Sequence, residues 1–215
     1  MEGRYCHLYP MEERFTPELH AANVEDDGRS WTYLPYGPFG SEHEYQQWVR
    51  RTCLNEDPLF HVIVDRASGR AAGVAAFMRI DQGSGSIEVG HLHFSPRLQR
   101  TRAATEAMYL MMRRAFERGY RRYEWKCDAL NARSRAAARR LGFTFEGVFR
   151  QATIYKGRNR DTAWYSIIDR DWPAVDQALQ LWLDPANFDH AGRQRVRLAA
   201  LIDRSERGRE MRGQE

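Results

Sequence analysis

The sequence predicts a mixed α/β (α+β) fold with a mostly antiparallel central sheet flanked by helices. The first observation is the order of segments: strand-like runs form a meander before residue 94, a strand–helix–strand–helix order follows, and a final strand pair comes last. The second is the lack of a G-x-G-x-x-G motif. Because continuous strand–helix alternation is missing too, we exclude a Rossmann-type dinucleotide fold.

The first half of the chain is expected to contain two short helices and an antiparallel set of strands. A Thr-Pro start predicts a helix over 16–23, and a capping box of Ser41 and Glu44 predicts another over 41–54. Apolar runs bounded by turn residues predict strands at 5–9, 59–65, 71–80 and 86–94.

The second half is expected to be richer in helix. An amphipathic pattern predicts a helix at 103–118, which Gly119 ends. Asn131 is expected to cap a helix that runs to Leu141. The other predicted elements are strands at 120–127, 143–150 and 162–169, a helix near 174–183, and a short helix at 190–202 in a charged tail.

Composition limits the class of protein. The 215 residues, 42% hydrophobic, suffice for one domain over 1–172 and a C-terminal helical extension with a charged tail over 173–215. No apolar run approaches the roughly 18–20 residues of a membrane span, and the first thirty residues do not resemble a secretory signal. We therefore expect a soluble, cytoplasmic protein with no membrane partner.

Net charge and cysteine content argue against several classes of partner and site. The net charge of +4 is modest and carboxylates interrupt every basic stretch, which argues against nucleic-acid binding. The cysteines are odd in number and far apart, at Cys6, Cys53 and Cys127, so neither a disulfide framework nor a zinc knuckle is expected. No metal site is predicted. The apolar helix near 174–183 favours a homodimer.

Residues 86–107 are the most informative segment. They read as a strand, a proline turn, a basic loop and a helix start. A helix N-terminus presents free backbone N–H groups and the positive end of the helix dipole, which together bind phosphate. Flanking arginines add charge, so the segment predicts an anion cradle.

The same segment resembles the acyl-CoA-binding core of the GNAT superfamily of N-acyltransferases. Residues 99–104 (QRTRAA) lie where that superfamily has Q/R-x-x-G-x-G/A, although Arg102 replaces the first glycine. Further blocks resemble the ribosomal-protein N-terminal acetyltransferase (Rim-type) branch: Glu88-Val89-Gly90, Thr105-Glu106-Ala107, Asn131 to Ser134, Leu141-Gly142-Phe143, Glu146-Gly147 and Arg160-Asp161-Thr162. The resemblance covers about residues 5–172.

The resemblance implies acetyl-CoA as co-substrate, no metal, and transfer of the acetyl group to a primary amine of a protein N-terminus or a small molecule. It also implies that two neighbouring strands splay near Gly90, with the pantetheine arm between them. The implied acetyl-CoA-binding residues are Leu92, His93, Phe94, Gln99, Arg100, Thr101, Arg102, Ala103, Ala104, Thr105, Asn131 and Ser134. The alternative function is acyl-CoA binding without transfer.

Glu88 is the predicted general base, since a carboxylate can accept the amine proton. The alternative is a Glu on a solvent-facing strand or one paired with arginine. His91 and His93 are one strand repeat apart and so are expected on one face, opposite to Glu88. One of them is the alternative base or a shaper of the acceptor pocket. By resemblance, Ser134 protonates the leaving thiolate, and Tyr155 is the second candidate acid.

Two further groups of residues are expected near this site: a set of arginines and an aromatic loop. Six arginines are candidates for phosphate contacts: Arg97, Arg100, Arg102, Arg135, Arg139 and Arg140. Two prolines, two glycines and four aromatic residues predict a loop at 30–40. Its aromatic residues either form a wall of the acceptor pocket or pack on one another: Trp31, Tyr33, Tyr36 and Phe39.

Overall fold

The computed structural model contains a seven-stranded sheet in the order β1-β2-β3-β4-β5-β7-β6. The structure describes residues 1–212, with side chains as far as residue 205. Only β4 and β5 pair in parallel among the neighbouring strands of this sheet, which confirms the mostly antiparallel prediction. The strands are β1 (Cys6–Pro10), β2 (Leu59–Asp65), β3 (Arg70–Asp81), β4 (Ser86–Phe94), β5 (Arg122–Asp128), β6 (Thr144–Tyr155) and β7 (Arg158–Ile168).

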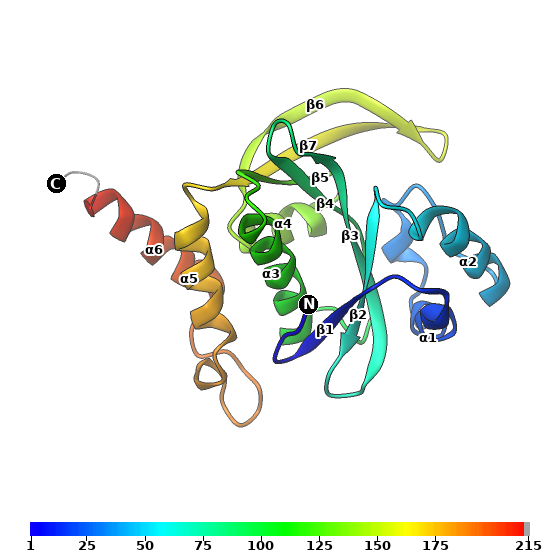
Figure 1. Ribbon diagram of the computed structural model, residues 1–215, viewed down its shortest axis with the longest axis horizontal. Helices are drawn as coiled ribbons and strands as arrows, with labels where there is room; N and C mark the ends of the chain where they lie inside the picture. Colours follow the sequence, from blue (N-terminus) through cyan, green and yellow to red (C-terminus); the bar gives the residue numbers. More distant parts are fainter. Residues whose placement is uncertain (213–215) are drawn as a thin grey trace.

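Helices cover both faces of the sheet (Figure 1). α1 (Thr16–Asn23) and α2 (Glu42–Trp48) lie on one side, and α3 (Arg102–Glu117) and α5 (Trp172–Leu183) lie on the other. Each side has its own apolar cluster, one built on α3 and α5 and one on α1 and α2. The remaining helices are α4 (Ala132–Arg140), α6 (Leu198–Arg212) and the short turns Glu13–Phe15, Arg29–Trp31, Val49–Cys53 and Pro185–Asn187.

β4 and β5 separate halfway along their length. Their parallel pairing ends at Val89 and Trp125. Beyond that point β4 continues on β3 as far as Phe94, and β5 continues on β7 as far as Asp128. The splay expected near Gly90 is therefore present.

A β-bulge in β4 lies at the same place. Gly90 pairs with Ala76 and His93 pairs with Val74, so β4 has one residue more than β3 between these pairs, and His91 has a φ of 51°. A bulge reverses the side-chain alternation. The prediction that His91 and His93 face away from Glu88 is wrong, because Val89 and Leu92 pack into the α3 cluster while both histidines share the face of Glu88.

The C-terminal segment packs against α3. Five apolar residues of α5 are buried in the chain's own core, namely Val175, Ala178, Leu179, Trp182 and Leu183, whereas Leu181 is half exposed. They do not supply a free surface, and the homodimer stays a prediction. The predicted helix at 190–202 is wrong in position, because the Asp189 carboxylate accepts hydrogen bonds from the N–H groups of Ala191 and Arg193 and holds a turn. The end of the predicted charged tail, 213–215, lies outside the described residues.

Glu106 fixes the first strand to α3. Its buried carboxylate accepts hydrogen bonds from the backbone N–H groups of Arg4, Tyr5 and Cys6, at 2.8, 2.5 and 2.8 Å. Burial and this neighbouring carboxylate raise the pKa of the Cys6 thiol. The glutamate of the Thr105-Glu106-Ala107 block therefore has a structural function. No helix within the described chain is long and apolar enough to cross a membrane.

Candidate functional site

The loop before α3 is closed by its own hydrogen bonds. The Gln99 side chain donates to Phe94 O at 2.8 Å, and the Thr101 hydroxyl donates to Leu98 O at 2.7 Å. The Thr101 oxygen also accepts from Ala104 N at 3.1 Å, which makes Thr101 the helix N-cap. The first turn of this 16-residue helix thus has a fixed direction, with the positive end of its dipole at the splayed strands. These residues fit a phosphate.

Most of the arginines predicted at the phosphates have partners within the protein. The Arg102 guanidinium lies 4.8 Å from the ring centres of both Tyr5 and Phe188, so its side chain stacks between aromatic rings. Arg97 pairs with Glu25. The others with partners are Arg135, which donates to Ala129 O and Tyr165, Arg139, which lies over the Phe145 and Tyr165 rings, and Arg140, which donates to Thr105. Of the six candidate arginines, Arg100 is the one whose side chain has no partner within the described residues. It is exposed and has a φ of 62°, so it is the candidate for a phosphate contact in the cradle.

A cleft of about 240 Å³ opens where β4 and β5 separate. Residues 88–92 of β4 and 125–128 of β5 line it. Tyr33, Leu34 and Pro35 of the aromatic loop close it from one side, and the remaining lining residues are Met78, Arg79, Asn131 and Arg160. A second cavity of about 300 Å³ lies between α1 and the aromatic loop, and no residue of β4 or β5 lines it.

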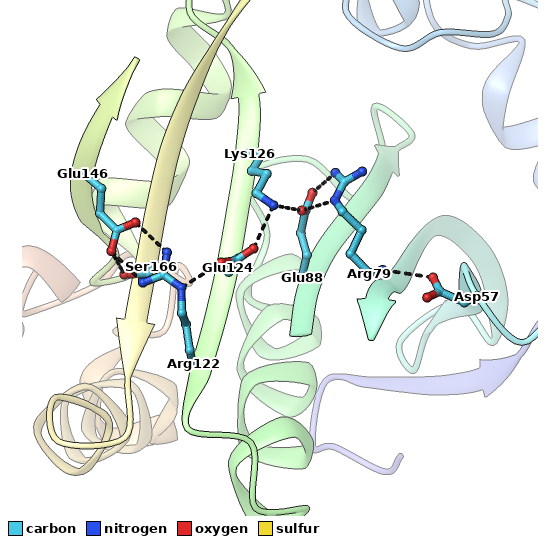
Figure 2. A network of polar contacts seen from close by, with 8 residues as sticks. All are labelled: Asp57, Arg79, Glu88, Arg122, Glu124, Lys126, Glu146 and Ser166. Carbon is cyan, nitrogen blue, oxygen red and sulfur yellow. Dashed lines mark hydrogen bonds and ion pairs between the residues drawn. The ribbon is translucent and has the colours of Figure 1, made fainter. Parts of the chain in front are cut away.

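Glu88 lies in the cleft with both carboxylate oxygens bound by cations (Figure 2). Arg79 donates to both oxygens, each at 2.6 Å, and Lys126 Nζ lies 2.9 Å from Oε2. Glu88 is 2% exposed, whereas the Arg79 side chain is 54% exposed. The arginine-paired alternative for Glu88 is therefore observed, since its carboxylate takes part in ion pairs with both Arg79 and Lys126.

The ion pairs extend across the sheet. Lys126 also contacts Glu124 at 2.8 Å, and Arg122 contacts Glu124 and Glu146 in turn. Figure 2 shows the resulting row of alternating charges. At one end Asp57 accepts a hydrogen bond from Arg79 N, and at the other the Ser166 hydroxyl donates to Glu146. The alternation of Arg122, Glu124 and Lys126 in the sequence was the available signal for one charged strand face. The row as a whole was not predicted.

The two histidines of β4 differ in position. His91 lines the cleft, and its Nδ1 lies 2.9 Å from the Tyr36 hydroxyl. His93 is buried, stacks on Trp31 at 3.7 Å, and has Nε2 2.8 Å from the Ser30 hydroxyl. Burial lowers the pKa of each imidazole to about 4, so both are neutral near pH 7.

The two candidate acids, Ser134 and Tyr155, both make hydrogen bonds within the protein. The Asn131 side chain accepts from Ser134 N at 3.1 Å, which confirms the N-cap of α4. The Ser134 hydroxyl accepts from Trp125 Nε1 at 2.9 Å, directly behind the cleft wall. Tyr155 donates to Asp128 at 2.8 Å, and burial followed by this hydrogen bond raises its pKa. Neither Ser134 nor Tyr155 is among the residues that line the cleft.

The aromatic loop combines both expected arrangements. Trp31, Tyr36 and Phe39 pack on one another, whereas Tyr33 lines the cleft. The β6–β7 hairpin holds the loop: Lys156 Nζ donates to the carbonyl oxygens of Trp31 and Gly37, both at 2.9 Å, and Arg158 donates to Thr32 O at 2.8 Å. These contacts were not predicted, since they join segments more than a hundred residues apart. Among the described residues, no group of three His, Cys, Asp or Glu side chains could hold a metal ion.

Comparison with known proteins agrees with this geometry. The model of the acetyltransferase (GNAT) domain family matches residues 7–144. A GCN5-related N-acetyltransferase from Brucella melitensis is 47% identical, with a TM-score of 0.92, over 94% of this chain and 93% of that one. A probable GNAT-family acetyltransferase from Chromobacterium violaceum is 44% identical, with a TM-score of 0.76, over 80% and 87%.

A more distant structure shares the fold alone. The acetyltransferase from Salmonella typhimurium that modifies the N-terminal serine of ribosomal protein L7/L12 is 24% identical, with a TM-score of 0.67, over 77% of this chain and 96% of that one. No curated protein sequence matches this chain significantly.

Proposed function

Since the chain belongs to the GNAT acetyltransferase family, we propose that it moves an acetyl group from acetyl-CoA to a primary amine by direct attack within the β4–β5 cleft. The observation that carries the proposal is the end of β4–β5 pairing at Val89 and Trp125, next to the capped N-terminus of α3. A strand edge without a partner offers backbone N–H and C=O groups to an amide-bearing ligand such as the pantetheine arm.

Different residues bind the donor, accept the amine proton and protonate the leaving thiolate in the proposed reaction. The first turn of α3 and Arg100 bind the pyrophosphate, and β4 beyond Val89 with Asn131 binds the arm. The amine nitrogen attacks the thioester carbonyl carbon, the C–S bond breaks, and the thiolate leaves. The amine proton passes to a base of the cleft, and Ser134 protonates or stabilises the thiolate. Tyr155 is less suited, because its proton already binds Asp128.

Two groups can accept the amine proton. Glu88 acts when the substrate ammonium takes the place of Arg79, whose half-exposed side chain is free to move aside. His91 lines the same cleft and is neutral, but its lowered pKa makes it a weak base. We keep Glu88 as the base, with His91 as the alternative.

The acceptor is an amine of a protein N-terminus or of a small molecule, and the reaction takes place in the cytoplasm. Three buried cysteines without a disulfide suit that compartment. The alternative function, acyl-CoA binding without transfer, is supported by the ion pairs of Glu88, which occupy both of its carboxylate oxygens.

One experiment separates the two functions. Purified protein is mixed with acetyl-CoA and a panel of amines and peptides, and acceptors are analysed by mass spectrometry for the gain of one acetyl group. A thiol reagent records coenzyme A release in parallel. Transfer predicts acetylated product with equal thiol release. Saturable acetyl-CoA binding without amine-dependent thiol release across the panel would support the alternative.

A further inference from the structure

Arg160 enters the cleft from β7. It pairs with Thr153 of β6, beyond the point where β5 ends opposite Thr162. Ala163 and Tyr165 face the α3 cluster, so Thr162, Trp164 and Arg160 face the other side, where Trp164 carries the Lys126 ammonium at 3.7 Å. Arg160 therefore shares the face of Glu88, opposite to the face on which α3 packs.

The Arg160 guanidinium has no anionic partner in the described part of the chain. Its Nε is buried and makes no hydrogen bond, and its one ring contact is with Tyr155 at 5.9 Å. The other cations of this face are paired: Arg79 and Lys126 with Glu88, and Arg122 with Glu124 and Glu146 (Figure 2). Arg158 donates to Thr32 O and to Tyr155.

Asp128, which lines the same cleft as Arg160, and Asp161, its neighbour in the chain, both have other partners. Asp128 accepts from the Tyr155 hydroxyl and from Leu130 N, both at 2.8 Å. Asp161 accepts from Gln151 N and from the Asn159 amide. A buried guanidinium atom without a protein partner is costly, and native proteins satisfy such an atom with ordered water, an ion or a ligand. A planar guanidinium fork binds a carboxylate or phosphate through two hydrogen bonds.

We propose that Arg160 binds an acidic group of the acceptor, so that the substrate is an amine that also bears a carboxylate or a phosphate. This inference rests on the proposed acetyl transfer and names its substrate class. The acidic group belongs to the acceptor because the donor phosphates bind at α3, on the other face of the sheet. Tyr33, Leu34 and Pro35 close the cleft beside it and limit the acceptor to a small molecule or a chain end.

The test compares acceptors that differ only in the acidic group. The pairs are phenylalanine with phenylalaninamide, glycine with glycinamide, and phosphoethanolamine with ethanolamine, so that carboxylate and phosphate are separated. For wild type, we expect kcat/KM to be at least tenfold higher for the acidic acceptor than for its uncharged partner, either in the carboxylate pairs or in the phosphate pair. Arg160→Met reduces that ratio to about twofold or less, Arg160→Lys restores part of it, and Arg150→Met, an exposed change on β6, keeps the wild-type ratio.

A binding measurement separates failure of this inference from failure of the proposed function. Calorimetry with the same pairs in the presence of coenzyme A records acceptor binding without turnover. Preferential binding of the acid that is lost in Arg160→Met, without acetylation, supports the inference and contradicts the transfer. The inference is overturned if wild type binds and acetylates the acidic acceptor and its uncharged partner equally well. It is also overturned if the ratio is unchanged in Arg160→Met. Acetyl-CoA affinity serves as the folding control for each variant.

Discussion

The donor side and the acceptor side of the cleft are built in different ways. The phosphate-binding part of the donor side is one continuous segment, residues 95–105, closed by hydrogen bonds between near neighbours. The acceptor side joins the 30–40 loop, three strands and the β6–β7 hairpin through ion pairs and long-range hydrogen bonds. In the proposed function a local motif binds the substrate that the family shares, and a non-local surface leaves room for acceptors to differ.

The largest effect is expected at the attachment of the donor helix. Glu106→Ala leaves three backbone N–H groups without their carboxylate. At about 1–3 kcal/mol for each buried unsatisfied group, the free energy of unfolding should fall by about 4 kcal/mol in urea titrations. The matched control is Glu117→Ala, at the exposed end of the same helix, whose ion pair with Arg113 contributes about 0.5 kcal/mol or less. A loss below about 1 kcal/mol for Glu106→Ala would show that the N-terminus is held by other contacts.

The acceptor side should be the part that is sensitive to acid. His93 has a pKa of about 4 in the folded protein and about 6.5 when unfolded. Between these values the unfolded chain binds a proton that the folded chain does not, so stability falls as the pH is lowered from 6.5 to 4. One pKa unit corresponds to about 1.4 kcal/mol, which gives a loss of at most about 3 kcal/mol.

His91 contributes in the same direction on the acceptor side, and His61 does so on the α3 face of the sheet, since burial lowers the pKa of each to about 4. Urea titrations at a series of pH values measure the loss. The slope should be smaller in His93→Gln than in wild type. Equal slopes would mean that the buried imidazole does not titrate in this range.

The role of Glu88 tests whether the acceptor side performs chemistry or only holds charges in place. Glu88→Gln is expected to lower kcat at least tenfold near neutral pH, or about 1.4 kcal/mol. Arg79→Met removes one cation from the carboxylate and should lower kcat by less than about threefold, because in the proposed reaction the substrate ammonium takes the place of this half-exposed arginine.

Equal losses in both variants would assign Glu88 to positioning. Thermal unfolding of both variants is needed alongside the kinetics, because Glu88 is buried. An unchanged rate and pH profile in Glu88→Gln would remove it from catalysis, and the loss should then appear in His91→Gln.

The smallest effect on kinetics is expected where the donor motif departs from its family. Arg102→Gly restores the glycine, and the KM for acetyl-CoA should change by less than about threefold, because the guanidinium stacks on Tyr5 and Phe188. Stability should fall by about 1–2 kcal/mol through the lost cation–π contacts. Steady-state kinetics and thermal unfolding measure both, with Arg102→Lys as the control that keeps the charge. A tenfold rise in KM would mean that the side chain reaches a phosphate.

The sequence could predict the donor side because its signals are local. The predicted helix 103–118 is found at Arg102–Glu117, and the Asn131 cap is found as expected, since a cap depends on residues three positions apart. The histidine faces were predicted wrongly because a single inserted residue reverses strand alternation. Gly90 inside a strand was a signal for that bulge.

The acceptor side could not be predicted in the same way. The row from Arg79 to Glu146 depends on the strand order β3-β4-β5-β7-β6, in which β7 precedes β6. The unpaired state of Arg160 depends on Asp128 and Asp161 binding other groups, which no spacing in the sequence reveals.

Calorimetric titration of acetyl-CoA tests most directly whether the two sides are separate. Arg100→Glu places a carboxylate beside the first turn of α3, and Arg160→Met changes the acceptor side. Arg100→Glu should weaken acetyl-CoA binding at least tenfold through repulsion of the phosphates, while Arg160→Met should leave the Kd within about twofold of wild type. A Kd that rises as much in Arg160→Met as in Arg100→Glu would contradict the division of the cleft into a donor side and an acceptor side.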